Sequence, residues 1–313
     1  MARFLPFPHL QVLDIVVPQR GDITLTLSAM QALTSLRELR LYTRCKVKKV
    51  KVTSLVQAMG DMKTVTSLTL GVQGLRACLP SEALLHLTSL SLSGRVSVPR
   101  LPQGLRKLRL QNFGRPDNAS EWAEKLQTLA DFESLCLDEC TEEALLRLPC
   151  NLRSLVLQAQ SDKPVHCVFN PKYRFSAALG RVNRLQSLCI GCFFTTELFE
   201  SLNGVVLPEV HTFGFQLPSV IMGDDRCIQD GGVTNFKPDN GVVEMPGIFP
   251  RLQTMKIIFQ EDCLGLVHGV VELESAFMTP ELFPGLRHIV CCCQMLDLKL
   301  NDISPLCQVT CKY

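Results

Sequence analysis

A spaced pattern of leucines recurs along nearly the whole chain. Its clearest copy is Leu36-x-x-Leu39-x-Leu41, in which one residue separates the last two leucines. On a β-strand, residues two apart point to the same face, so Leu39 and Leu41 would face one side while Glu38 and Arg40 face the other. Such a strand has an apolar face that it cannot bury alone, whereas copies laid side by side would share one core.

The same spacing returns many times, with some leucines replaced by other apolar residues. Including the copy at residue 36, about eleven copies are present, and they begin near residues 10, 36, 65, 87, 105, 132, 152, 185, 210, 252 and 286. The four copies at 36, 87, 105 and 152 keep leucine at all three positions, where random shuffling would give roughly one or two such copies. Proline precedes several copies and biases the chain away from helix as it enters the strand.

The segments between the copies predict short helices. In residues 80–87, Ser81 is placed as a helix N-cap and Leu84, Leu85 and Leu87 form an apolar face. Comparable segments are residues 54–62, 120–129, 142–148, 175–182 and 195–202. A strand followed by a helical return, repeated, predicts an α/β solenoid with a curved parallel sheet on the concave side and short helices and loops on the convex side.

Residues 1–313 are expected to form one repeat domain, because no linker divides the chain. Residues 216–247 are dense in Gly, Asp and Pro and lack periodicity, so they are predicted to be a loop insertion in one repeat. Residues 294–313, in which Leu296, Leu298 and Leu300 alternate, are predicted to be a C-terminal cap or tail.

At these residues the chain resembles leucine-rich repeat proteins of an irregular intracellular type, whose family motif is L-x-x-L-x-L-x-x-N/C-x-L. The resemblance covers about residues 7–293. The asparagine or cysteine of the motif is present only at Cys140, so a ladder of asparagine side chains is not expected to connect the repeats. The resemblance implies a non-enzymatic interaction module, for example a substrate-recognition subunit of a ubiquitin ligase, an immune-receptor-like protein or a cytoskeletal or ciliary scaffold.

The composition is that of a folded protein whose net charge is too small to attract polyanions. The chain has 313 residues, 46% of them hydrophobic, and a formal net charge of +2. This balance gives no reason to expect a nucleic-acid or membrane partner, and no apolar run has the length of a transmembrane helix. The fifteen cysteines are odd in number and often lie in apolar runs, which favours buried thiols and a cytoplasmic location. We expect a monomer or one member of a hetero-complex.

One basic run departs from this balance. Lys46, Lys48, Lys49 and Lys51 follow Arg44 directly after the second copy. Two interpretations remain open: a nuclear import signal or phosphate contact, and a solvated turn.

No motif for enzyme chemistry is present, so we expect neither catalysis nor a cofactor. The sequence lacks a phosphate-binding glycine loop, an H-E-x-x-H helix and a G-x-S-x-G elbow. Cys189 and Cys192 have the C-x-x-C spacing of a redox or zinc pair, but alternation along a strand would make the two thiols diverge.

The C-terminal cysteines support a different class of function. If a cap folded back, Cys307 and Cys311 could approach Cys292, and the protein would then be metal-stabilised or redox-active. The opposing interpretation is that these cysteines are buried as small apolar residues. Metal analysis and thiol titration distinguish the two.

The outward strand positions supply the candidate partner-binding residues. These are Glu38, Arg40, Tyr42, Lys107, Arg109, Gln111 and Asp138. Arg40, Tyr42, Lys107 and Arg109 are expected to be the energetic anchors, because Arg and aromatic side chains dominate binding hot spots. A nucleic-acid groove would carry basic and stacking residues along its whole length, so a protein or peptide partner is favoured. A solvated concave face, with binding through the loops or the convex side, remains the alternative.

Overall fold

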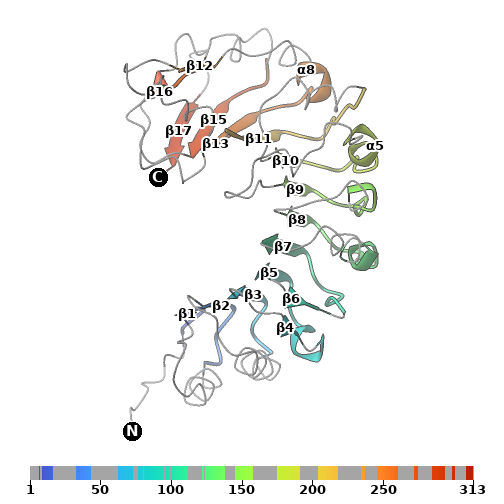
Figure 1. Cartoon of the computed structure of the whole chain (residues 1–313), viewed down its shortest axis with the longest axis vertical. Helices are drawn as coiled ribbons and strands as arrows, with labels where there is room; N and C mark the ends of the chain where they lie inside the picture. Colours follow the sequence, from blue (N-terminus) through green and yellow to red (C-terminus); the bar gives the residue numbers. More distant parts are fainter. Residues whose placement is uncertain are drawn as a thin grey trace. The chain divides into compact units, whose positions relative to one another are not determined.

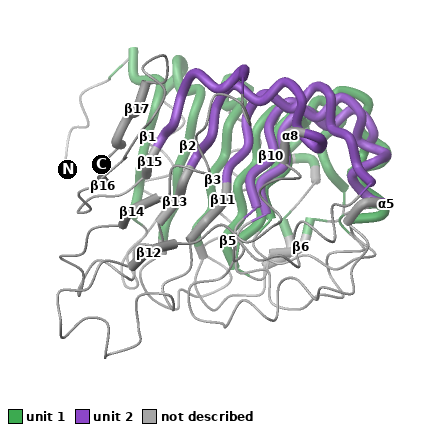
Figure 2. Tube along the Cα trace, turned by 90° about the horizontal axis from the view of Figure 1, so that it is seen from above, with its two compact units in different colours: residues 1–149 green, residues 150–313 purple. Residues whose placement is uncertain are grey.

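Parallel strands that coincide with the leucine motif form the framework of the chain in the computed structural model (Figure 1). The structure describes residues 7, 9–16, 33–43, 63–72, 77–79, 81–94, 96–98, 100–111, 122, 124–137, 145–157, 175–190, 204–217, 234–236, 245–259, 271–273, 284–292, 298–299 and 308–312. The chain divides into unit 1, Met1–Pro149, and unit 2, Cys150–Tyr313, which Figure 2 shows in different colours.

Six parallel strands form the main sheet of unit 1. They are β1 (Val12–Val16), β2 (Glu38–Thr43), β3 (Ser67–Val72), β5 (Ser89–Ser93), β7 (Lys107–Gln111) and β8 (Ser134–Leu137). Each strand pairs with the next one in the order β1-β2-β3-β5-β7-β8. The register aligns equivalent motif positions, so that Leu39, Leu68 and Leu90 are partners on successive strands.

Short elements connect the strands of unit 1 on one side of the sheet (Figure 1). The strands β4 (Ala77–Cys78) and β6 (Val96–Ser97) pair with each other, and η1 (Ser81–Leu84) is a 3₁₀ turn between them. The helix predicted at residues 80–87 is therefore a single tighter turn. Within the predicted helix at residues 120–129, Trp122 and residues 124–127 are helical, whereas residues 54–62 lie outside the described residues.

A lysine anchors one of these helical returns. Lys125 Nζ donates a hydrogen bond to the carbonyl of Val98 at 2.8 Å and lies 5.5 Å from the ring centroid of Trp122. The ammonium therefore has both a hydrogen-bond acceptor and an aromatic face as neighbours.

Unit 2 repeats the arrangement with less regular connections. Its main sheet has the order β9 (Ser154–Leu157), β10 (Ser187–Ile190), β11 (Thr212–Leu217), β13 (Thr254–Phe259), β15 (His288–Cys292) and β17 (Gln308–Lys312). The returns include α5 (Phe175–Leu179) and α8 (Met245–Ile248). A second parallel sheet joins β12 (Thr234–Phe236), β14 (Val271–Leu273) and β16 (Leu298–Lys299).

Two segments singled out in the sequence contain elements of unit 2. Within residues 216–247 the structure describes the end of β11, the strand β12 and the start of α8, and the remainder lies outside the described residues. Within residues 294–313 it describes β16 and β17, of which β17 pairs with β15. The predicted helix at residues 195–202 lies outside the described residues.

Alternation along the strands separates the core from the opposite face, as the motif predicts. The inward leucines Leu39, Leu68, Leu90, Leu108, Leu135 and Leu155 are each 2% exposed or less. Burying one such side chain contributes about 1.5–3 kcal/mol. Buried leucines at equivalent positions of successive strands confirm the predicted fold, a repeat solenoid of parallel strands that is leucine-rich-repeat-like.

A ladder of backbone hydrogen bonds connects successive repeats at the start of their strands. The carbonyl of Arg37 accepts from the N–H groups of Thr66 at 2.9 Å and Ser67 at 3.0 Å. The same two-donor arrangement occurs at the carbonyls of Gln11, Thr66, Thr88, Arg106, Arg153, Gln186, His211 and Gln253. Because backbone atoms supply every bond, the repeats are connected without the asparagines of the regular motif.

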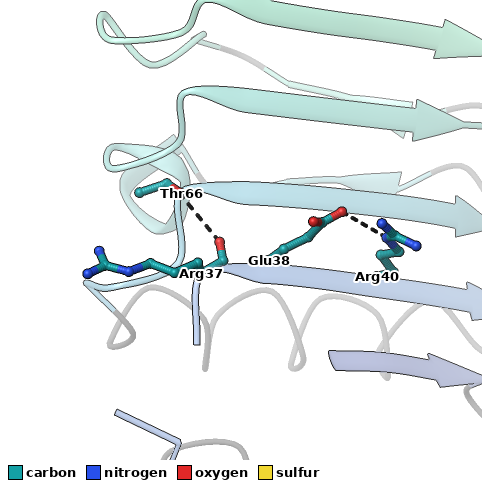
Figure 3. A network of polar contacts seen from close by, with 4 residues as sticks. All are labelled: Arg37, Glu38, Arg40 and Thr66. Carbon is teal, nitrogen blue, oxygen red and sulfur yellow. Dashed lines mark hydrogen bonds and ion pairs between the residues drawn. The ribbon is translucent and has the colours of Figure 1, made fainter. Parts of the chain in front are cut away.

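Two threonines strengthen this ladder in unit 1. Thr66 Oγ1 donates to the carbonyl of Arg37 at 3.5 Å (Figure 3), and Thr88 Oγ1 donates to the carbonyl of Thr66 at 3.3 Å. The carbonyl of Arg37 thus has three donors around it, all from the following repeat.

Proline in the ladder is expected to destabilise unit 1. The N–H of Arg106 donates to the carbonyl of Thr88 at 2.8 Å, and proline would remove this donor and restrict Leu105. Arg106→Pro should lower the free energy of unfolding by about 1–3 kcal/mol. Arg106→Ala should stay within about 0.5 kcal/mol, because the side chain is exposed. Urea unfolding followed by circular dichroism measures both, and equal losses would contradict a role for this backbone donor.

Candidate functional site

The outer face of unit 1 is the side of its main sheet that bears the strand residues alternating with the core leucines. From β1 to β8 these are Val12, Asp14, Val16, Glu38, Arg40, Tyr42, Ser67, Thr69, Gly71, Ser89, Ser91, Ser93, Lys107, Arg109, Gln111, Ser134 and Cys136. Adjacent strands lie about 4.8 Å apart, so these residues form one continuous surface.

An ion pair holds the charged residues of β2 in place. Arg40 Nε donates to Glu38 Oε1 at 2.8 Å, two residues away on the same face (Figure 3). This hydrogen bond and the negative charge of Glu38 raise the pKa of Arg40, and Tyr42 and Asp14 add smaller effects in the same direction. The guanidinium is therefore a positioned donor whose charge is compensated by two neighbouring carboxylates. In Figure 3 the side chain of Arg37 extends away from this pair.

Tyr42 lies across the backbone of the neighbouring strand. The register pairs Tyr42 with Gly71, and a Cβ added at Gly71 would stand only 2.7 Å from Cδ1 of the ring. The missing side chain at position 71 is what lets the ring lie against β3. Although it is packed in this way, Tyr42 is 37% exposed, so one side of the ring faces outward.

Two exposed valines lie on β1, and one of them is beside Tyr42. Val16, the register partner of Tyr42 on β1, is 47% exposed, and Val12 on the same strand is 46% exposed. We call Val16 and Tyr42 the apolar patch, since Val12 is the register partner of Glu38 and Asp14 lies between it and Val16 on the same face. Of Val12, Val16 and Tyr42, only Tyr42 is a candidate from the sequence. The valines could have been recognised in the sequence, because they occupy outward positions of a predicted strand, where polar residues are more usual.

The contact between Tyr42 and Gly71 can be tested by a double-mutant cycle. Gly71→Ala forces the ring to move and should lower the free energy of unfolding by about 1–3 kcal/mol. In a Tyr42→Ala background the same change should be neutral or stabilising, because alanine suits a strand better than glycine. Urea unfolding of the four proteins gives the coupling energy. Additive effects would mean that the ring does not rest on Gly71.

A second group of charged and polar residues occupies β7. Lys107 and Arg109 are exposed, and the amide oxygen of Gln111, in its hydrogen-bonding orientation, accepts from Arg109 Nη2 at 2.8 Å. Their register partners on β5 are Ser89, Ser91 and Ser93. Asp138, the remaining candidate residue, lies outside the described residues.

Short side chains separate the two groups. The outer positions of β3 and β5 carry only serine, threonine and glycine, whereas β2 and β7 carry long side chains on either side. The strands β2 and β7 are three strand steps apart, which is about 14 Å. The structure therefore brings Glu38, Arg40 and Tyr42 together at one place and Lys107, Arg109 and Gln111 at another, on the same face.

Two neighbouring outward positions of unit 2, Cys189 and Gly214, are buried. Cys189 on β10 stands on the side opposite the core leucines yet is only 8% exposed. Its register partner is Gly214 on β11, and Cys189 Sγ lies 2.9 Å from where a Cβ at Gly214 would be. The thiol thus occupies the space that glycine leaves open. At this place the expected row of exposed outward residues is not found.

The C-terminal cysteines lie partly outside the described residues, so the metal hypothesis for them remains a prediction. The register aligns Cys311 of β17 with Cys291 of β15, and Cys292 with Lys312, while Cys307 lies outside the described residues. Among the described residues, no group of three or more His, Cys, Asp and Glu side chains could hold a metal ion. No described helix is long and apolar enough to cross a bilayer. The basic run at residues 44–51 also lies outside the described part of the chain.

The chain matches no protein-family model, and it matches no curated protein.

Proposed function

We propose that this chain is a non-enzymatic interaction module that binds a protein or peptide partner on the outer face of unit 1. The observation that carries the proposal is the apolar patch beside Arg40. Parallel sheets are normally covered on both faces, but here Val12, Val16 and Tyr42 are exposed on one face of a parallel sheet. Val16 and Tyr42 are register partners, and exposed apolar side chains that lie together with an arginine nearby are the composition of a protein-binding hot spot.

The charge pattern favours a protein partner over a nucleic acid. Carboxylates of Asp14 and Glu38 stand next to Arg40, and a phosphate backbone crossing β1 and β2 would meet them. Nucleic-acid surfaces instead carry unbroken basic rows with stacking aromatics. A protein partner tolerates both signs of charge, because its own side chains can match them.

We place the chain among irregular intracellular leucine-rich repeat proteins, in a substrate-recognition, immune-receptor-like or scaffold role. The motif and the sequential order of parallel strands support this placement. A cytoplasmic location is supported by the fifteen cysteines, an odd number, many of which lie in apolar runs. In this role the chain would act as a monomer or as one member of a hetero-complex.

Two outer-face substitutions test the proposal. A partner is first captured from native cells with the full chain and identified, and its affinity is then measured by calorimetry. Tyr42→Ala combined with Lys107→Glu should weaken binding at least 10-fold, because hot-spot side chains typically contribute more than about 1.4 kcal/mol each.

The control is Lys63→Glu, which makes the same charge reversal at an exposed residue of unit 1 that is not on the outer face. It should leave the affinity within about 2-fold, as peripheral charges contribute little. A partner that binds wild type and the double variant equally well would show that the outer face is not the binding surface.

A further inference from the structure

The apolar patch and the basic residues Lys107 and Arg109 lie on different strands of the outer face of unit 1. The apolar patch lies on β1 and β2. Among the described outer residues from β3 to β8, the charged ones are Lys107 and Arg109, both on β7. The acidic residues of the face, Asp14 and Glu38, stand beside Arg40 on β1 and β2. A partner lying across the strands would therefore meet an apolar surface first and a cationic surface second.

The spacing of the apolar patch and these basic residues sets the length of the partner segment. Crossing from β2 to β7 covers about 14 Å, which four to five residues of an extended chain span at about 3.3 Å each. Lys107 and Arg109 are two residues apart on one strand, so their side chains leave the sheet about 7 Å from each other. Two carboxylates at the far end of the segment can each meet one cation.

The surface between the apolar patch and these basic residues suits an extended backbone. The outer residues of β3 and β5 include Ser67, Thr69, Ser89, Ser91 and Ser93, whose side chains are short. Their hydroxyl groups can donate to peptide carbonyls and accept from peptide N–H groups. Long side chains here would obstruct a crossing chain, and apolar ones would leave its backbone unpaired.

We infer that the partner is an acidic peptide segment, bound in an extended conformation across β2, β3, β5 and β7. An apolar side chain of the segment rests on the apolar patch, and four to five residues further along two carboxylates contact Lys107 and Arg109. Arg109 offers the planar donor geometry that matches a carboxylate, and Lys107 offers a point charge. This inference rests on the proposed function, since it names the partner of the same surface.

The test uses a displayed library of random 12-residue peptides selected against the full chain. Wild type should enrich peptides with Asp or Glu four to five residues from an aliphatic or aromatic residue. Lys107→Glu/Arg109→Glu should lose this acidic preference and enrich Lys or Arg instead. The control, Lys63→Glu/Arg100→Glu, makes the same charge change at exposed residues away from the outer face and should keep the acidic preference.

A single selected peptide, labelled with fluorescein, then gives affinities by anisotropy. Lys107→Gln/Arg109→Gln, a milder change that removes both positive charges without reversing them, should weaken it at least 10-fold, and added salt should weaken its binding to wild type. Tyr42→Ala should also weaken it, by loss of the apolar contact. Thermal unfolding of each variant establishes that it is folded.

The outcomes separate this inference from the proposed function. Selected peptides whose affinity falls in Tyr42→Ala but whose sequences show no preference for Asp or Glu would contradict the inference that the partner is acidic. The outer face would remain the binding surface. Peptides whose affinity is unchanged by Tyr42→Ala and by the β7 substitutions would overturn both. No enrichment above background would overturn the extended-peptide partner, while the captured protein still tests the surface itself.

Discussion

Replacing Phe213 with alanine is expected to lower the free energy of unfolding by about 3–5 kcal/mol, the largest effect of any substitution considered for this protein. Phe213 lies on β11 and is completely buried. Its ring stacks on that of Phe249, with centroids 4.7 Å apart and planes inclined by 27°. Removing it deletes apolar contacts and leaves a cavity that strands held by a backbone ladder on both sides cannot readily close.

The matched control for Phe213 is its neighbour Thr212, a half-buried residue on the opposite face of the same strand. Thr212→Ala should cost less than about 1 kcal/mol, because it opens no core cavity. Urea unfolding followed by circular dichroism measures both variants. A double-mutant cycle with Phe249→Leu should show a coupling of about 0.5–1.5 kcal/mol from the ring contact. Similar losses for both single variants would argue that Phe213 is not part of a packed core.

The second large effect is expected at Leu90 in the middle of the unit 1 sheet. Leu90→Ala should lower the free energy of unfolding by about 2–5 kcal/mol. The side chain is 1% exposed, and its register partners on both sides are leucines, Leu68 and Leu108. Because each repeat contacts its neighbours, the cavity weakens both adjoining interfaces.

Hydrogen exchange can localise the damage at Leu90. Exchange in Leu90→Ala should rise most in β3, β5 and β7 and least in β1, which lies furthest along the sheet. Ser91→Ala, on the outer face of the same strand, should change neither stability nor exchange appreciably. Uniform acceleration throughout unit 1 would instead show that its repeats unfold as one block.

Several features of the candidate surface could be read from the sequence. Alternation in the motif predicted that Glu38, Arg40, Tyr42, Lys107, Arg109 and Gln111 lie on strands and point away from the leucines, as the structure shows. Their role in binding remains a prediction. The packing of the Tyr42 ring against Gly71 could not be predicted in the same way, because the two residues become neighbours only through the register of strands that are far apart in the sequence.

The leucine motif located eleven strands of the main sheets of units 1 and 2 and the core-facing residues of each, because a period of two is a local property of any extended chain. The sequence also showed that asparagine side chains could not connect the repeats. The packing of distant repeats was needed to show what connects them, how exposed Val12 and Val16 are, and that Gly214 makes room for Cys189. Each of these features depends on which residue of the adjacent strand becomes the register partner. That pairing is established only when neighbouring repeats pack together.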